Sequence, residues 1–157
     1  MNKILMVCLG NICRSPLAEG ILRHKLVKAG ILTVSVDSAG TADYHVGQAP
    51  DERSIANALR HQIDISKHRG RQFKLGDFSA YDHIYAMDAS NLDHIISMAN
   101  TDEDRSKVSL ILTELYADKQ TSVPDPYFGG EEGFEQVFQL LDKACDAVLT
   151  KITNSKN

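Results

Sequence analysis

Two cysteines, an arginine and a serine lie close together in the segment VCLGNICRSP, residues 7–16. Arg14 follows Cys8 after five intervening residues, and Ser15 comes next. These side chains could form an anion site that contains a nucleophile, because a guanidinium binds two oxygens of a phosphate and a thiolate attacks electrophiles. A cysteine here could also be a core residue, a metal ligand or half of a disulfide. The elements that position the segment decide among these readings.

The pattern around this segment predicts a strand followed by a helix. Residues 2–8 form a short apolar run typical of a buried strand, and residues 16–30 carry apolar residues at helical spacing. Ser15 is expected to cap this helix, Pro16 suits its first turn and Gly30 suits its end.

The rest of the chain continues the alternation. Further strands are expected over residues 33–38, 81–88 and 107–112, and further helices near residues 51–62, 89–100 and after residue 130. This order predicts a parallel α/β sheet with right-handed crossovers in a single domain, residues 1–157. Ligands of such sheets bind beyond the carboxyl ends of the strands, which is where residues 8–15 lie.

Composition narrows the class of protein. The net charge of -4 argues against nucleic acid or an anionic membrane as the main partner. No apolar run approaches the roughly 20 residues of a membrane span. Three cysteines do not make a disulfide framework in a chain of this length, so we expect a reduced, cytoplasmic protein.

The turn from strand to helix suits a tetrahedral oxyanion. Backbone N–H groups of residues 8–15 can converge on an anion, and the helix N-terminus adds positive potential. Gly10 permits close approach of the backbone, and Asn11 tolerates left-handed geometry. Arg14 would bind the oxyanion and favour a thiolate at Cys8. Ser15 could form a hydrogen bond with the sulfur and stabilise it as a leaving group. The segment lacks the G-K-[ST] of a nucleotide loop and the C-x2-C of a zinc site, so no metal or cofactor is expected.

A proton donor for this chemistry is available in VPDPYFGG, residues 123–130. Asp125 follows the fourth expected strand, and Pro124 and Pro126 restrict the backbone on both sides of it. Attack on a phosphomonoester expels an alkoxide or phenoxide, which a protonated carboxyl group assists. The same carboxylate could then accept a proton from the attacking water.

These two motifs resemble those of the low-molecular-weight protein tyrosine phosphatases. The likeness extends through DSAGT (37–41), YHVGQAPDERS (44–54), HRGRQF (68–73), YDHIYAMDASNL (81–92) and the final helix. The resemblance implies a three-layer α/β fold, with a four-stranded parallel sheet in the order 2-1-3-4 and helices on both faces. It implies Cys8 as the nucleophile that forms a phosphocysteine, Arg14 as the phosphate clamp and Asp125 as general acid and then base.

The resemblance also implies roles for the residues around these three. The loop residues Leu9, Gly10, Asn11, Ile12, Cys13 and Ser15 would bind phosphate, Tyr44 and Tyr127 would line the entrance, and Ser38 and His68 would join Asn11 and Ser15 in a supporting hydrogen-bond network. Cys13 matches a family cysteine that can form a disulfide with the nucleophile under oxidation. Phe128 stands where many members carry a second tyrosine, which in some of them is a phosphorylation site. The difference leaves the aromatic wall intact, but this position lacks the tyrosine that such regulation requires.

The expected substrate is a tyrosine-phosphorylated protein, and the chain is expected to be a monomer or a weak dimer. One alternative is an arsenate reductase of the same fold, although that activity needs an additional cysteine pair in the middle of the chain, where this sequence has none. Another is a non-catalytic phosphoprotein-binding module. Such a module would be expected to lose the nucleophile or the acid, whereas Cys8, Arg14 and Asp125 are all present.

Overall fold

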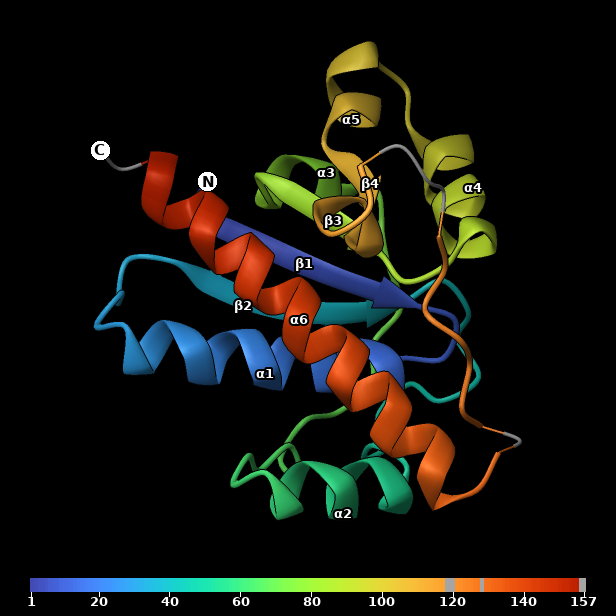
Figure 1. The fold of residues 1–157 in the computed structure, drawn as a ribbon. Helices are drawn as coiled ribbons and strands as arrows, with labels where there is room; N and C mark the ends of the chain where they lie inside the picture. Colours follow the sequence, from blue (N-terminus) through green and yellow to red (C-terminus); the bar gives the residue numbers. More distant parts are fainter. Residues whose placement is uncertain (118–120, 128, 156–157) are drawn as a thin grey trace.

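The computed structural model describes residues 1–117, 121–127 and 129–155, arranged as a sheet between helices (Figure 1). In chain order the elements are β1 (Lys3–Cys8), α1 (Arg14–Lys28), β2 (Ser35–Gly40), α2 (Glu52–Arg60), α3 (Gly76–Ala80), β3 (His83–Ala86), α4 (Ala89–Met98), α5 (Asp102–Ser106), β4 (Val108–Leu110), the 3-10 helix η1 (Ile111–Glu114) and α6 (Glu131–Ser155).

The strands form one parallel sheet in the order β2-β1-β3-β4, which confirms the expected fold. β1 lies in the interior of the sheet, with β2 on one side and β3 on the other. The last residue of β1, Cys8, is in register with Gly40, the last residue of β2. The loops that follow these strands therefore emerge at the same edge of the sheet.

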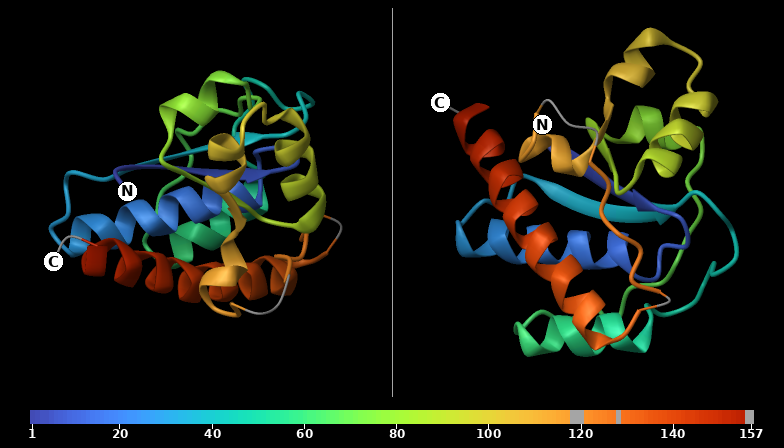
Figure 2. Two further views of the ribbon diagram at one scale, coloured as in Figure 1. Left: turned by 90° about the horizontal axis from the view of Figure 1, so that it is seen from above. Right: turned by 45° about the vertical axis from the view of Figure 1, so that its right-hand side comes forward.

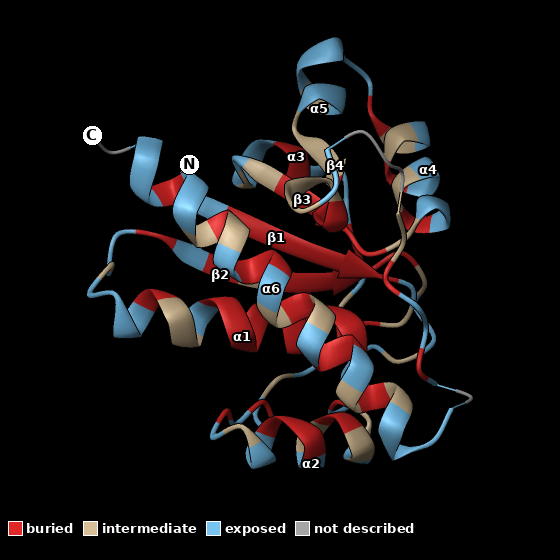
Figure 3. Ribbon diagram, in the orientation of Figure 1, coloured by how far each residue is buried: buried red, intermediate tan, exposed pale blue. Residues whose placement is uncertain are grey.

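Alternate residues of β1 point into two different cores. Ile4, Met6 and Cys8 pack with residues of α1 and α6, whereas Leu5 and Val7 pack with α3 and α4. Figure 2 shows the helices on either side of the sheet, and Figure 3 shows β1 buried along nearly its whole length. A strand covered on both faces reads as the continuous apolar run found in the sequence.

The sequence predicts the main elements but not every boundary. The apolar run over residues 107–112 is a strand only at Val108–Leu110, and Ile111 and Leu112 belong to η1, where both are fully buried. An apolar run that is buried in either conformation gives no periodic signal to separate strand from 3-10 helix. The short helices α3 and α5 were not expected, because five residues are too few to display a helical period.

The end of α1 follows its expected chemistry, whereas its beginning does so only in part. α1 ends at Lys28, and Gly30 then adopts a φ of 71°, a left-handed conformation that glycine accepts without strain. At the other end Pro16 lies in the first turn, as predicted, but the helix begins at Arg14, so that Ser15 lies inside this turn rather than before it.

Candidate active site

Cys8 ends β1 with its side chain almost completely buried (2% exposed). Residues 9–13 then run to the start of α1, and we call residues 8–13 the anion loop. The end of β2 packs against this loop: Thr41 N–H donates to the Cys8 carbonyl at 2.9 Å. A Cβ at Gly40 would lie only 2.8 Å from the Leu9 carbonyl oxygen, so this close approach requires glycine.

The prediction that Ser15 caps α1 is wrong. Cys13 precedes the helix, and no side chain caps this end. The Oγ of Ser15 lies instead 3.0 Å from the Sγ of Cys8, and it accepts a hydrogen bond from Nδ2 of Asn11 at 2.8 Å. The other acceptor near this hydroxyl, the Ala39 carbonyl, is farther away at 3.4 Å. Ser15 is thus placed to donate its proton to the sulfur.

Asn11 connects the anion loop to its surroundings. Its backbone has a φ of 57°, the left-handed geometry that the sequence suggested. Its Nδ2 donates to the hydroxyls of Ser15 (2.8 Å) and Ser38 (2.9 Å). Its Oδ1 lies 3.1 Å from Nε2 of His68 and accepts from the N–H of Arg71 at 3.0 Å. Asn11, Ser15, Ser38 and His68 therefore belong to one hydrogen-bond network that reaches Cys8.

A buried carboxylate completes this network. The Ser38 hydroxyl donates to Oε1 of Glu19 at 2.7 Å, and Nδ1 of His68 lies 3.6 Å from the same oxygen. Arg23 pairs with the other oxygen of Glu19 at 2.8 Å. Sequence reasoning missed Glu19, because a glutamate within a helix ordinarily faces solvent.

Arg14 is buried behind the anion loop (3% exposed) and is held by two partners. Its Nη1 donates to Oδ2 of Asp88 at 2.7 Å and to the Val123 carbonyl at 3.0 Å. Burial alone would lower the pKa of the guanidinium, but the charges of Cys8 and Asp88 outweigh this and raise the pKa above its usual value. Arg14 is therefore a fixed cation beside the thiol.

Asp125 reaches the same place from a distant part of the chain. Its Oδ2 lies 3.7 Å from Nη2 of Arg14, and its Oδ1 accepts the N–H of Tyr127 at 3.0 Å. The side chain is 42% exposed, in contrast to the buried Arg14. We call residues 122–127 the acid loop. The structure thus brings together the thiol, the guanidinium and the carboxyl group that the sequence singled out.

Comparison with known proteins shows the family to which the chain belongs. The family model described as "Low molecular weight phosphotyrosine protein phosphatase" matches residues 3–157. The chain belongs to this family. A Synechocystis protein named as a putative low molecular weight protein-tyrosine-phosphatase is 43% identical over 153 residues, covering 96% of both chains. The human low molecular weight phosphotyrosine protein phosphatase is 40% identical over 152 residues, covering 96% of this chain and 95% of its own.

Solved structures of the family have the same fold. A protein tyrosine phosphatase from Entamoeba histolytica, with Hepes in its active site, superposes with a TM-score of 0.92 at 34% identity, and the match covers 100% of both chains. A Drosophila protein described as an arginine phosphatase gives a TM-score of 0.88 at 35% identity, covering 96% of this chain and 97% of its own.

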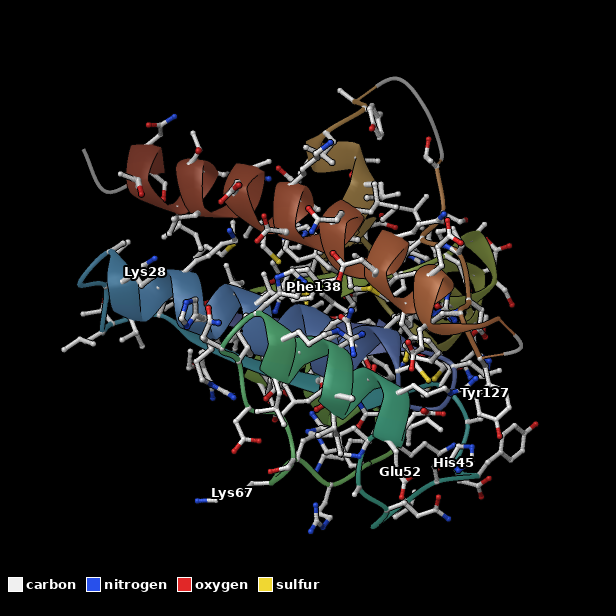
Figure 4. The ribbon with its side chains drawn as sticks, turned by 60° about the horizontal axis from the view of Figure 1, so that its bottom comes forward. Lys28, His45, Glu52, Lys67, Tyr127 and Phe138 are labelled. Carbon is white, nitrogen blue, oxygen red and sulfur yellow. The ribbon has the colours of Figure 1, made fainter. Side chains whose placement is uncertain are left out.

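In this family member a pocket of about 210 Å3 opens above Cys8. It is lined by Cys8, Leu9, Gly10, Ile12, Cys13, Arg14, Tyr44, His45, Asp125 and Tyr127. Tyr44 is 69% exposed and Tyr127 is 40% exposed, so both stand at the rim. Figure 4 shows Tyr127 and His45 near one end of the molecule, far from Lys28 at the opposite end of α1.

Sequence reasoning missed His45 and Asp88. The imidazole of His45 packs over the anion loop at Gly10. It lies so close that a Cβ at Gly10 would be 3.0 Å from Cδ2 of His45. Asp88 lies just beyond the end of β3, so the rule that ligands bind at the carboxyl ends of parallel strands could have singled it out. No motif identifies His45, which lies in the irregular segment between β2 and α2.

Among the described residues, no group of three or more His, Cys, Asp and Glu side chains could hold a metal ion. Within the same residues, no helix has the length and apolar character required to cross a membrane. Phe128, which the sequence comparison noted, lies outside the described residues.

Proposed function

We propose that this protein hydrolyses phosphotyrosine in proteins, with Cys8 as nucleophile, Arg14 as phosphate clamp and Asp125 as general acid and base. The observation that carries the proposal is the convergence of these three side chains on one pocket. Two relatives that are about 40% identical, from human and pig, are named phosphotyrosine protein phosphatases.

In the first step the Cys8 thiolate attacks phosphorus. An S–P bond forms as the bond between phosphorus and the tyrosyl oxygen breaks, and Asp125 gives its proton to the departing phenolate. Arg14 and the N–H groups of the anion loop bind the phosphoryl oxygens while charge redistributes among them. The fixed ion pair with Asp88 holds Arg14 ready for this contact, 2.7 Å from the carboxylate.

In the second step water attacks the phosphocysteine. The Asp125 carboxylate accepts a proton from the water, the S–P bond breaks, and inorganic phosphate leaves with the thiolate restored. The hydrogen bond from Ser15, at 3.0 Å, supports the thiolate as it departs from phosphorus. No electron is transferred in either step, and no further reactant besides water is needed.

The shape of the pocket favours an aryl phosphate. Cys8 is buried, whereas Tyr44 and Tyr127 stand at the rim with much of their surface exposed. A phosphotyrosine extends far enough to place its phosphate beside Cys8 while its ring packs against these aromatic walls. The side chain of phosphoserine is too short to reach the same depth.

The alternatives named from the sequence are less well supported. An arsenate reductase would need a further cysteine pair, but beyond Cys8 and Cys13 the chain has only Cys145. Cys145 is fully buried in α6, where its thiol faces the Ala18 carbonyl at 3.7 Å. A non-catalytic module would not need Asp125 and Cys8 to share one pocket.

The test is hydrolysis of phosphopeptides by the purified protein without added metal. We expect phosphotyrosine peptides and p-nitrophenyl phosphate to be cleaved, and phosphoserine and phosphoarginine peptides to be poor substrates. Cys8→Ser should abolish turnover while vanadate still binds, and the matched Cys145→Ala variant should stay active. Turnover by Cys8→Ser would refute the nucleophile, and a preference for phosphoarginine would refute the proposed substrate.

A further inference from the structure

The first turn of α2 contacts both segments that carry the proposed chemistry. The N–H of Asp51, the residue that caps α2, donates to the Ile12 carbonyl at 2.8 Å. The hydroxyl of Ser54 donates to the Cys13 carbonyl at 3.1 Å. These two bonds attach α2 to the anion loop. The start of α6, which follows the acid loop, lies beside the start of α2 (Figures 1 and 2).

Arg53 extends this attachment to the backbone beyond Asp125. Its Nη2 donates to the Tyr127 carbonyl at 2.8 Å, and its Nη1 donates to the Gly129 carbonyl at 3.1 Å. The guanidinium also lies 5.6 Å from the ring centre of Tyr127 and 4.7 Å from that of Phe134, at distances typical of cation–π contact. One side chain therefore binds the acid loop and the beginning of α6.

The orientation of Arg53 is itself fixed by Asp51. Nε of Arg53 donates to Oδ1 of Asp51 at 3.0 Å, and Nη2 donates to Oδ2 at 2.9 Å. A bidentate pair of this kind fixes the plane of the guanidinium as well as its position. Because Asp51 is also bonded to the anion loop through Ile12, a short series of contacts joins that loop to the acid loop.

Asp125 depends on this support because its own side-chain contacts hold it weakly. One is with a residue two positions along the chain, and the other is longer than a hydrogen bond. Its Oδ1 bonds to the N–H of Tyr127, in the backbone that Arg53 holds, and its Oδ2 is 3.7 Å from Arg14. On the other side of Asp125, the acid loop is bound where Val123 N–H donates to the Met87 carbonyl at 2.7 Å. Arg53 binds the backbone that follows Asp125, at the carbonyls of Tyr127 and Gly129.

We propose that Arg53 is a positioning residue that holds the Asp125 carboxyl at the leaving-group oxygen by binding the backbone of Tyr127 and Gly129. The proposal rests on the proposed function, in which Asp125 protonates the leaving group. A small displacement of a catalytic group is enough to slow the step that it assists. Removing Arg53 should therefore slow departure of the leaving group, as removing Asp125 would, but less severely. Binding of the oxyanion by the anion loop should not change.

The test compares two esters that differ in their need for an acid. Phenyl phosphate has a poor leaving group, whereas p-nitrophenyl phosphate has a good one. Arg53→Met should lower kcat/KM, which reports the steps up to departure of the leaving group, by about tenfold or more for phenyl phosphate and much less for p-nitrophenyl phosphate. The inhibition constant of vanadate, which reports the anion loop, should not change.

A matched control lies on the same helix. Arg60 is the exposed last residue of α2, and Arg60→Met removes the same charge without touching either loop. It should leave the rate of hydrolysis of both esters unchanged. Arg53→Lys keeps a cation beside Asp51 but cannot bind two carbonyls in a fixed plane, so it should recover only part of the lost rate. If Arg53→Met fails to fold, Arg53→Lys gives the same comparison.

The Asp125→Asn background separates this proposal from the function on which it rests. If Arg53 acts through Asp125, adding Arg53→Met to Asp125→Asn should cause no further loss. Two results would overturn the role of Arg53 and leave that of Asp125 intact. One is a further loss of kcat/KM in the double variant as large as the loss that Arg53→Met causes in the wild type. The other is an equal loss of kcat/KM for both esters in Arg53→Met alone. If Asp125→Asn itself lowers kcat/KM equally for both esters, the proposed acid is wrong, and the positioning role falls with it.

Discussion

The Oγ of Ser15 lies 3.0 Å from the Sγ of Cys8, although serine at the start of a helix ordinarily bonds to the backbone. Here α1 begins at Arg14 with no side-chain cap, so the hydroxyl is available to the sulfur. Asn11 strengthens this arrangement by donating to the same oxygen at 2.8 Å, which leaves the hydroxyl proton for the thiolate. The Ser15 hydroxyl therefore contacts the sulfur of the proposed nucleophile and does not cap α1.

Removing this hydroxyl should slow catalysis more than it weakens binding. In Ser15→Ala the thiolate loses a charge-assisted hydrogen bond, a type of contact that contributes about 1.5–3 kcal/mol. We therefore expect kcat to fall by about ten- to a hundredfold, with little change in KM. Steady-state kinetics on p-nitrophenyl phosphate measure this. Ser106→Ala, at an exposed position of α5, is the control, and an unchanged kcat in Ser15→Ala would contradict the assigned role.

Neutralising Asp88 should weaken oxyanion binding. Oδ1 of Asp88 caps α4 by accepting a hydrogen bond from the N–H of Asn91 at 2.7 Å. Asp88→Asn removes the charge but keeps an oxygen that can cap the helix. In this variant the charge on Arg14 loses the nearer of its two carboxylate partners, which in a partly buried pair costs about 1–2 kcal/mol. Arg14 should then be held less firmly, so the inhibition constant of vanadate should rise about tenfold. An unchanged constant would show that the ion pair does not position Arg14. Asp93→Asn, exposed on the same helix, is the control.

The three cysteines should differ sharply in reactivity. Burial, followed by the negative charges of Asp51, Cys8 and Asp125, raises the pKa of the Cys13 thiol, and burial raises that of Cys145. Both should remain thiols at neutral pH and react slowly. Iodoacetamide should therefore modify Cys8 first, as peptide mapping by mass spectrometry can determine. The Cys8→Ser variant should be almost unlabelled, and rapid labelling of its Cys13 would contradict this prediction.

Stability should depend on pH through Asp51. The hydrogen bonds from Arg53 lower the pKa of this carboxyl group in the folded protein. Its unfolded value is about 3.9, so the unfolded chain binds the proton first as the pH falls. The stabilisation is fully present above about pH 5 and decreases as the pH falls through the folded pKa.

Urea unfolding of Asp51→Asn measures this contribution. The variant should be less stable than the wild type at neutral pH by about 1 kcal/mol, a value that allows for the partial exposure of Arg53. The difference should shrink in acid. Glu52→Gln, an exposed neighbour in the first turn of α2, should show no comparable change. A difference that stays constant down to low pH would contradict the contribution of the charged pair.

Local chemistry explains why much of the fold and part of the site could be predicted. The apolar run before Cys8, the glycine that ends α1, and the alternation of strands and helices are each visible in a short window of sequence. The anion loop follows from its residue types and its place after a strand. Asp125 could be singled out because prolines flank it and the proposed reaction requires an acid.

The residues that sequence reasoning missed depend on contacts between distant segments. Glu19 is buried because Ser38 and Arg23 bond to it, and nothing in α1 signals this. Arg53 bonds to the Gly129 carbonyl, far away along the chain. For Ser15 the residue types suggested two partners, the backbone at the start of α1 and the Cys8 sulfur. The hydroxyl lies beside the sulfur, and only the expected cap is wrong, because capping is a local preference that contact with another element can override.

Trapping the covalent intermediate tests the proposed role of Cys8 most directly. Wild-type protein is mixed with a phosphotyrosine substrate, quenched rapidly, digested and mapped by mass spectrometry. A phosphoryl group should appear on the sulfur of Cys8 during turnover, and none should appear in Cys8→Ser. Phosphate release from the wild type with no phosphocysteine at any time, or with the phosphoryl group on another side chain, would contradict that role.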